Sequence, residues 1–369
     1  MKKLSAVLLI IFLITNYSTL TAAAEELSYD YSAVYENLSD EASEKLSELG
    51  VSGADVNSLR NLSFENVMSQ LMQTAGESIE GPLKGLLTII AVLLLCSMLS
   101  MYKSALSGEV SDTLNTAAAL CISAAVAAPA VSFIGAAGAT VLNCANLFLA
   151  YIPVVTVMLA SSGKPVSAVT YQAAVTAAGQ GAARAFSEII VPLQYVFLGL
   201  GITSGIAPQI RLGGVTSMLS RLAKWVLGFV MAVFTAVLSV RQGVACSLDT
   251  VASRTAKFAL SSFVPVVGGA LSEAYKTVQG SVSVLKTGLG IFVILALAIT
   301  FMPLLLQGVG WSLCLFIGKS AAEVMGLDGC ASLLESLRNV FSVFIAVLLC
   351  LSAVFIICTA VVFTAGGAS

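Results

Sequence analysis

Long apolar runs recur along the chain from residue 85 onward, and short polar segments separate them. A helix needs about 20 apolar residues to cross roughly 30 Å of hydrocarbon, and several runs reach that length. Helices also pair every backbone N–H and C=O group internally, as lipid requires. The pattern therefore predicts spans near residues 85–102, 115–137, 141–161, 188–207, 225–241, 288–309 and 340–363.

Three stretches, residues 166–186, 242–287 and 311–327, fit a spanning helix less well because polar or charged residues interrupt them. Each could form an interfacial amphipathic helix, a half-helix that enters the membrane, or an unusual span. The predicted fold class is all-α: a polytopic helical membrane bundle over residues 81–369, with seven spans, give or take two.

The N-terminal region has the pattern of a secretory signal peptide. Lys2 and Lys3 precede an apolar core, and a run of small residues ends at Ala24. We therefore predict a signal peptide over residues 1–24, with an uncleaved first anchor as the alternative. Either arrangement exports residues 25–80, where loose helical spacing predicts short amphipathic helices.

One of these helices has clear end signals. Ser39 is an expected N-cap, and Gly50 is the expected stop after Leu49. The exported segment is read either as a small solvated domain or as a docking surface for another extracytoplasmic protein.

Charge is distributed unevenly and supports this division. Residues 25–80 hold twelve acids and two bases, which gives −10, whereas residues 81–369 hold fourteen bases and eight acids, which gives +6. Only 10% of the chain is charged and 58% is hydrophobic, against about a quarter charged in soluble domains. The acidic segment is thus expected in water, and residues 81–369 in a lipid bilayer.

Few residues offer catalytic chemistry. The chain has no histidine, which removes the commonest general base and the commonest transition-metal ligand. Its eight cysteines are scattered without a Cys-x-x-Cys pair. We therefore expect no enzyme activity, no cofactor, no metal site and no nucleic-acid partner.

The densest set of charges near the apolar runs surrounds a predicted helix break. Charged groups inside or beside spans are costly and often functional, and proline and paired glycines interrupt a regular helix. The segment is read either as a re-entrant element that lines a conduit or as a loop between surface helices. The candidate conduit or coupling residues are Asp249, Lys257, Pro265, Gly268, Gly269, Glu273 and Lys276.

A sequence match suggests an internal repeat. Tyr151-Ile-Pro-Val-Val and Phe263-Val-Pro-Val-Val are each followed by a lysine, Lys164 and Lys276, at the same spacing. With seven spans, units 115–210 and 225–320 would have opposite orientations, as in inverted-repeat transporters. The alternative is coincidence among apolar residues.

Orientation follows from the same count. If residue 85 starts outside, the basic region 241–287 falls in the cytoplasm, as the positive-inside rule prefers, but Arg221 and Lys224 fall outside. Trp225 and Trp311 sit at predicted span edges and are interpreted as interface anchors.

Three segments together resemble a known family. They are the run Lys224–Phe234, Asp249 with the run Arg254–Phe258, and the block Ser262–Ala274. In these segments the chain resembles stage III sporulation protein AE of endospore-forming Firmicutes, and the signal peptide, acidic segment and helical region fit that family.

The resemblance implies a membrane subunit of the channel complex that joins mother cell and engulfed forespore, in the mother-cell-derived membrane around the forespore. It implies partners from the same complex, namely ring-forming subunits and an ATPase. It carries over no catalytic residues. The alternatives are a self-contained secondary transporter and a non-conducting membrane scaffold.

Overall fold

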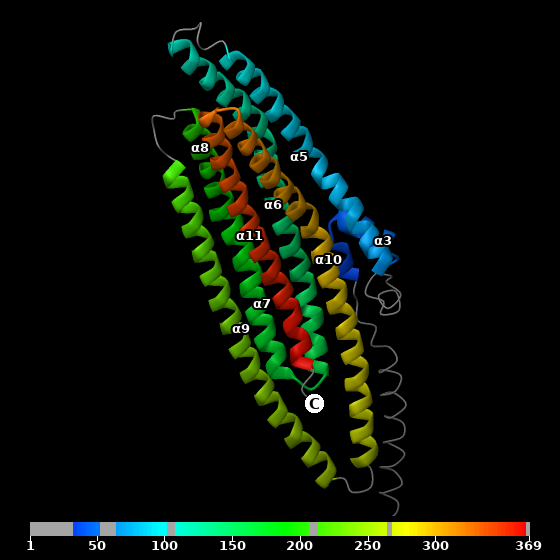
Figure 1. Cartoon of the computed structure of the whole chain (residues 1–369). Helices are drawn as coiled ribbons and strands as arrows, with labels where there is room; N and C mark the ends of the chain where they lie inside the picture. Colours follow the sequence, from blue (N-terminus) through cyan, green and yellow to red (C-terminus); the bar gives the residue numbers. More distant parts are fainter. Residues whose placement is uncertain (1–31, 52–63, 102–107, 207–212, 264–267, 367–369) are drawn as a thin grey trace, which may run out of the picture.

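The computed structural model of the chain describes residues 32–51, 64–101, 108–206, 213–263 and 268–366 (Figure 1). These residues form helices joined by turns, and they contain no strand. The helices are α2 (Ser32–Glu36), α3 (Asp40–Glu48), α5 (Phe64–Met101), α6 (Gly108–Ser161), α7 (Pro165–Ala185), the π-helix η2 (Phe186–Ile190), α8 (Val191–Ile206), α9 (Gly213–Phe263), α10 (Gly268–Val324) and α11 (Asp328–Gly366).

The expected capped helix of the acidic segment is confirmed as α3. The Ser39 Oγ accepts a hydrogen bond of 3.3 Å from the Ala42 N–H, and Gly50 follows the helix with φ of 75°. Two helical positions, Leu46 and Val34, bury their side chains against the bundle. Helices α2 and α3 thus pack on the long helices α6 and α10.

Among the described residues, six helical segments are long and apolar enough to cross a membrane. They are Met72–Leu99, Thr116–Ser161, Pro165–Ser204, Ser217–Asp249, Gly288–Val324 and Asp328–Ala360. The prediction of an all-helical protein with several candidate membrane spans is therefore confirmed. Residues 1–24, the predicted signal peptide, lie outside the described residues.

The span map differs from the sequence prediction in one main respect. The predicted spans 115–137 and 141–161 are a single continuous helix, α6, so residues 138–140 make no turn. The two uncertain stretches 166–186 and 311–327 fall largely within long helices, α7 with η2 and the end of α10. The apolar runs in the sequence show where helices form but not where they end. Packing against neighbouring helices allows a helix to continue through a short polar or small-residue interruption.

The junction of α7 and α8 contains a π-helical turn. Pro192 lies at the second position of α8 and has no N–H to donate to the Glu188 carbonyl in an α-helical ladder. A single π turn at Phe186–Ile190 shifts the hydrogen-bond pattern at this point and keeps the helix continuous.

Two of the tight turns between long helices have the same backbone conformation and hydrogen bonds. Gly163 and Gly326 adopt φ of 76° and 69°, where glycine has no steric penalty. The next residue's N–H then bonds back to the helix: Lys164 to the Leu159 carbonyl at 3.1 Å and Leu327 to the Ala322 carbonyl at 2.9 Å. These are Schellman motifs, and they reverse the chain at α6–α7 and α10–α11.

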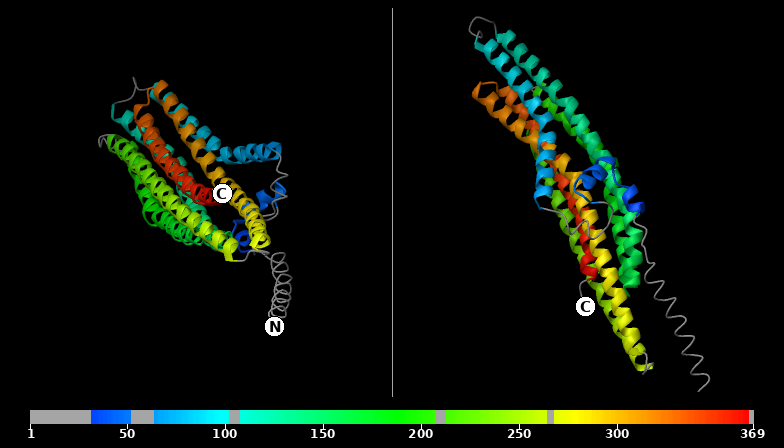
Figure 2. Two further views of the ribbon diagram at one scale, coloured as in Figure 1. Left: turned by 90° about the horizontal axis from the view of Figure 1, so that it is seen from below. Right: turned by 90° about the vertical axis from the view of Figure 1, so that its right-hand side faces the viewer.

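The long helices lie side by side in an elongated bundle, with α9 along one edge and α5 along another (Figure 2). At 1.5 Å per residue, the 54 residues of α6 extend about 80 Å, well beyond the roughly 30 Å of a hydrocarbon core. The helices therefore reach past the hydrocarbon region as well as through it.

The two proposed repeat units are not inverted. Each is a hairpin, α6 with α7–α8 and α9 with α10, and α6 and α9 run in the same direction (Figure 1). The equivalent prolines also differ, because Pro153 lies inside α6 whereas Pro265 lies outside the described residues. The prediction of opposite orientation was wrong because it counted α6 as two spans.

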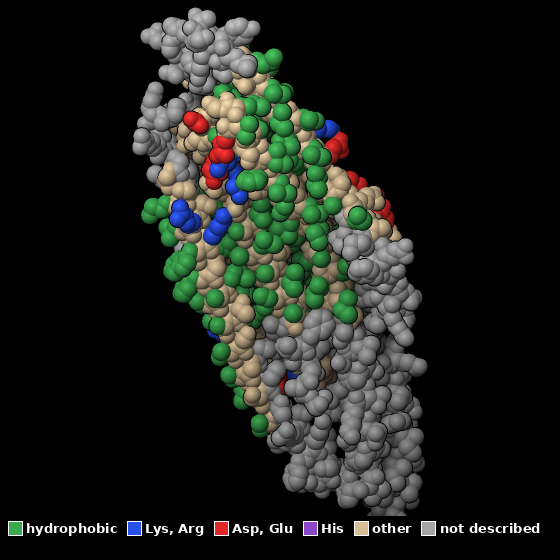
Figure 3. Space-filling view, viewed as in Figure 1, with side chains coloured by type: hydrophobic (Ala, Val, Ile, Leu, Met, Phe, Trp, Pro, Cys, Tyr) green, Lys and Arg blue, Asp and Glu red, His purple; other side chains and the backbone are tan. Residues whose placement is uncertain are grey.

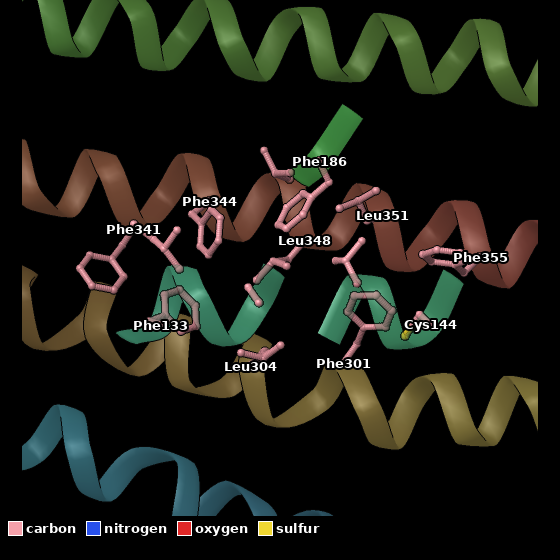
Figure 4. Close-up of a cluster of buried hydrophobic side chains, with 14 of the residues drawn as sticks. Phe133, Cys144, Phe186, Phe301, Leu304, Phe341, Phe344, Leu348, Leu351 and Phe355 are labelled. Atoms are coloured by element: carbon pink, nitrogen blue, oxygen red, sulfur yellow. The ribbon is translucent and has the colours of Figure 1, made fainter. Parts of the chain in front are cut away.

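Aromatic side chains from several helices fill the bundle centre (Figure 4). Phe133 of α6 lies 5.7 Å from Phe341 and 5.2 Å from Phe344 of α11, measured between ring centroids, and Phe148 lies 4.8 Å from Phe355. These matched pairs set the register between α6 and α11.

The two tryptophans have different environments. Trp225 is 68% exposed on α9, as an interface anchor would be. Trp311 is only 1% exposed and lies 5.8 Å from the Phe341 ring, so its interpretation as an interface anchor was wrong. The close approach of α5 buries Trp311, and no local sequence pattern reveals that approach.

Candidate functional site

Asp249 is the one candidate conduit residue whose side chain the structure describes. It is 2% exposed and is the only buried charged side chain among the described residues. Its Oδ1 accepts a hydrogen bond of 3.0 Å from the Val166 N–H, and its Oδ2 accepts one of 2.8 Å from the Ser167 N–H. The carboxylate of α9 therefore caps the first turn of α7.

The local sequence explains why α7 needs this partner. A helix start leaves its first N–H groups without intrahelical partners. The side chain of Lys164, at the N-cap, does not accept a capping hydrogen bond from the first turn, and Pro165 at the first helical position has no N–H. A negative charge also interacts favourably with the positive end of the helix dipole. Asp249 supplies both the acceptors and the charge from 82 residues away.

The remaining candidates cannot be placed relative to Asp249. Pro265 lies outside the described residues, and Gly268 and Gly269 open α10. The side chains of Lys257, Glu273 and Lys276 also lie outside the description. Their role as a conduit or coupling set stays a prediction.

A second group of charges lies toward the other end of the bundle, near the α10–α11 turn. We call it the charge cluster, and Figure 3 shows basic and acidic side chains gathered in the upper left part of a largely hydrophobic face. Three helices contribute to it, α9, α10 and α11. Its members are Lys224, Lys319, Glu323, Glu335 and Arg338.

Lys319 and Glu335 form the strongest contact in the charge cluster. The Lys319 Nζ lies 2.7 Å from a Glu335 carboxylate oxygen and 3.6 Å from one of Glu323. The same Glu335 oxygen lies 3.8 Å from Nη1 of Arg338, whose guanidinium also stands 4.9 Å from the centre of the Phe316 ring. The cluster thus ties α10 to α11 with partly exposed groups.

Lys224 reaches the same surface from α9. Its Nζ donates a hydrogen bond of 2.6 Å to the Ser342 Oγ of α11. Ser342 lies four residues after Arg338, so both project from one face of α11. Lys224 therefore comes close to Arg338, and the two positive charges repel each other.

Sequence reasoning noted Lys224 and the polar or charged residues within 311–327, but it did not connect them with Glu335 and Arg338. The spacing of Lys319 and Glu323, and of Glu335 and Arg338, predicts contacts within each helix. The contacts between helices depend on the register set by the α10–α11 turn. The sequence feature that could have indicated these contacts is the presence of charged residues both before and after Gly326, where the chain reverses between α10 and α11.

Two small cavities lie in the described part of the bundle. A cavity of ≈ 10 Å³ lies among Phe133, Phe341 and Phe344, about the volume of one water. A polar cavity of ≈ 90 Å³ lies between α3 and the long helices, lined by Ser39, Glu41, Ala42, Thr140, Asn143, Ile299 and Thr300. Neither cavity forms a passage along the bundle.

Comparisons with known proteins agree on one family. The family model described as stage III sporulation protein AE matches residues 54–366. Stage III sporulation protein AE of Bacillus subtilis (strain 168) is 28% identical over 225 residues, which cover 60% of this chain and 55% of that relative. No solved structure matches the chain. The chain, whose described residues include six helices long and apolar enough to cross a membrane, belongs to the stage III sporulation protein AE family.

Proposed function

We propose that this chain is a membrane subunit of the channel complex that joins mother cell and forespore during endospore formation. The family match over residues 54–366 carries this proposal, because it includes all six candidate spans. The aligned region covers only 55% of the curated relative, so its partners and location are proposed here as well. The partners are ring-forming subunits and an ATPase, and the location is the mother-cell-derived membrane around the forespore.

The packed core supports a subunit rather than a self-contained transporter. Transporter sites usually lie at membrane depth among polar groups and broken helices. In the described part of the bundle, aromatic rings such as Phe148 and Phe355, 4.8 Å apart, fill the space between the helices. A conduit would therefore form between this chain and its partners, or between copies, rather than through one bundle.

Compartment-specific expression tests the proposal. In a spore former that lacks its own copy, the gene for this chain is expressed from a promoter active only in the mother cell or only in the forespore. We expect heat-resistant spores from mother-cell expression alone. Equal rescue from the forespore would contradict the proposed membrane, and normal spores without any copy would contradict the function.

A non-conducting scaffold shares the packed core and needs a separate test. Glu273→Gln and Lys276→Gln should reduce spore yield if these side chains line a conduit, whereas a scaffold should tolerate both changes. Membrane abundance, measured by immunoblot, serves as the control. Normal abundance with normal spore yield would favour the scaffold.

A further inference from the structure

The charge cluster has one more positive charge than its carboxylates can balance. Lys224, Lys319 and Arg338 give three positive charges, against two negative charges from Glu323 and Glu335. Glu335 lies closer to Lys319, at 2.7 Å, than to Arg338, at 3.8 Å. Among the described residues, no carboxylate oxygen lies within ion-pair distance of Lys224. The excess charge is therefore concentrated at Lys224 and Arg338.

These two cations lie where a lipid headgroup could reach them. Both side chains are partly exposed at the boundary of α9 and α11. On α9, Trp225 and Phe229 are 68% and 59% exposed, and their rings stack 5.9 Å apart. Exposed tryptophan beside basic residues is characteristic of the interface between hydrocarbon and headgroups.

We propose that Lys224 and Arg338 bind the phosphate group of an anionic phospholipid at the edge between α9 and α11. Basic groups between membrane helices recognise lipid headgroups in this way. The Arg338 guanidinium suits phosphate because its N–H groups can donate in pairs. The acyl chains would lie along the exposed surface of α9 beside the stacked rings of Trp225 and Phe229.

Trp225 is an intrinsic fluorescent probe of lipid binding at this site. Trp225 directly follows Lys224, and the other tryptophan, Trp311, is buried. The full chain is reconstituted in phosphatidylcholine vesicles that contain a small fraction of brominated phosphatidylglycerol or of brominated phosphatidylcholine. Bromine quenches a nearby indole, so the difference in quenching measures preference for the anionic lipid at Trp225.

We expect stronger quenching by the anionic lipid, and a preference reduced roughly fivefold by Lys224→Gln or by Arg338→Gln. Arg241→Gln is the matched control, because Arg241 is exposed on the same helix, about 26 Å from Lys224. It should leave the preference unchanged, while Trp225→Phe should abolish the difference.

Three results would overturn the proposal. Equal quenching by both lipids in the wild-type chain would show no anionic preference, and this result does not depend on how any variant folds. A loss as large for Arg241→Gln would indicate general surface charge. Displacement of the anionic lipid by millimolar inorganic phosphate would identify a site for free phosphate, without the acyl chains.

Discussion

At the scale of single residues, Asp249 shows how an ionisable group near a span can have a structural role. Both carboxylate oxygens accept backbone hydrogen bonds, at 3.0 and 2.8 Å. Its 2% exposure leaves little surface for a substrate or coupling ion. Its described contacts are those of a helix cap supplied by a neighbouring helix.

Asp249→Ala should destabilise the protein by about 1–3 kcal/mol, because it leaves two buried N–H groups without acceptors. Thermal unfolding of the purified protein in detergent measures the change. Ser247→Ala is the control, since the exposed Ser247 hydroxyl bonds only to the Gly243 carbonyl of its own helix at 2.9 Å. Unchanged stability in Asp249→Ala would refute the capping role.

The sequence marked Asp249 as noteworthy but gave no indication of its hydrogen-bond partners. The observed partners, Val166 and Ser167, precede it by more than 80 residues. Local signals such as the Ser39 cap were predictable because donor and acceptor lie within one turn. A cap from another helix depends on tertiary packing.

At the scale of helices, the close approach between α5 and α10 leaves no room for a side chain at Gly85. A Cβ built at Gly85 would overlap the ring of Trp311, whereas one built at Gly76, on the same helix, would have no neighbour within 4 Å. Trp311 is fully enclosed and cannot easily move aside.

Gly85→Ala should therefore destabilise the protein by about 1–3 kcal/mol through overpacking. Gly76→Ala should be neutral or slightly stabilising, because alanine favours a helix more than glycine does. Trp311 fluorescence in a Trp225→Phe background reports the local change. A similar effect from both substitutions would contradict this packing of α5 on α10.

The contact between α10 and α11 is open to a double-mutant cycle. Lys319 and Glu335 are 2.7 Å apart, with side chains 26% and 37% exposed. Partial exposure limits their coupling to about 0.5–1 kcal/mol. Lys319→Glu should lower stability, and Lys319→Glu with Glu335→Lys should recover part of the loss. Additive losses would show that the pair does not interact.

At the scale of the whole molecule, the number of helices decides the topology. The six candidate spans found among the described residues alternate in direction, so the C-terminal ends of α5, α8 and α10 lie on one side of the membrane and those of α6 and α9 on the other. If residues 25–80 are exported, the C-terminal ends of α5, α8 and α10 are cytoplasmic. Arg221 and Lys224 then lie near the cytoplasmic side, as the positive-inside rule prefers.

The fold class was predictable from the sequence because apolar length and low charge are properties of the whole chain. The path through the membrane was not predictable in the same way. The small and polar residues Gly138-Ala139-Thr140 resemble a break between two spans, yet they lie inside the continuous helix α6. Merging two spans into one reversed the predicted side of every later segment. It also changed an inverted repeat into two hairpins that run the same way.

Cysteine labelling tests the six-helix arrangement most directly. In a chain whose native cysteines are replaced, single cysteines are introduced as Ser161→Cys, Gly214→Cys and Val324→Cys, all at exposed positions near helix ends. A membrane-impermeant maleimide is applied to intact cells. We expect labelling at Ser161→Cys and protection at the other two, whereas labelling at Gly214→Cys and Val324→Cys with protection at Ser161→Cys would contradict the arrangement.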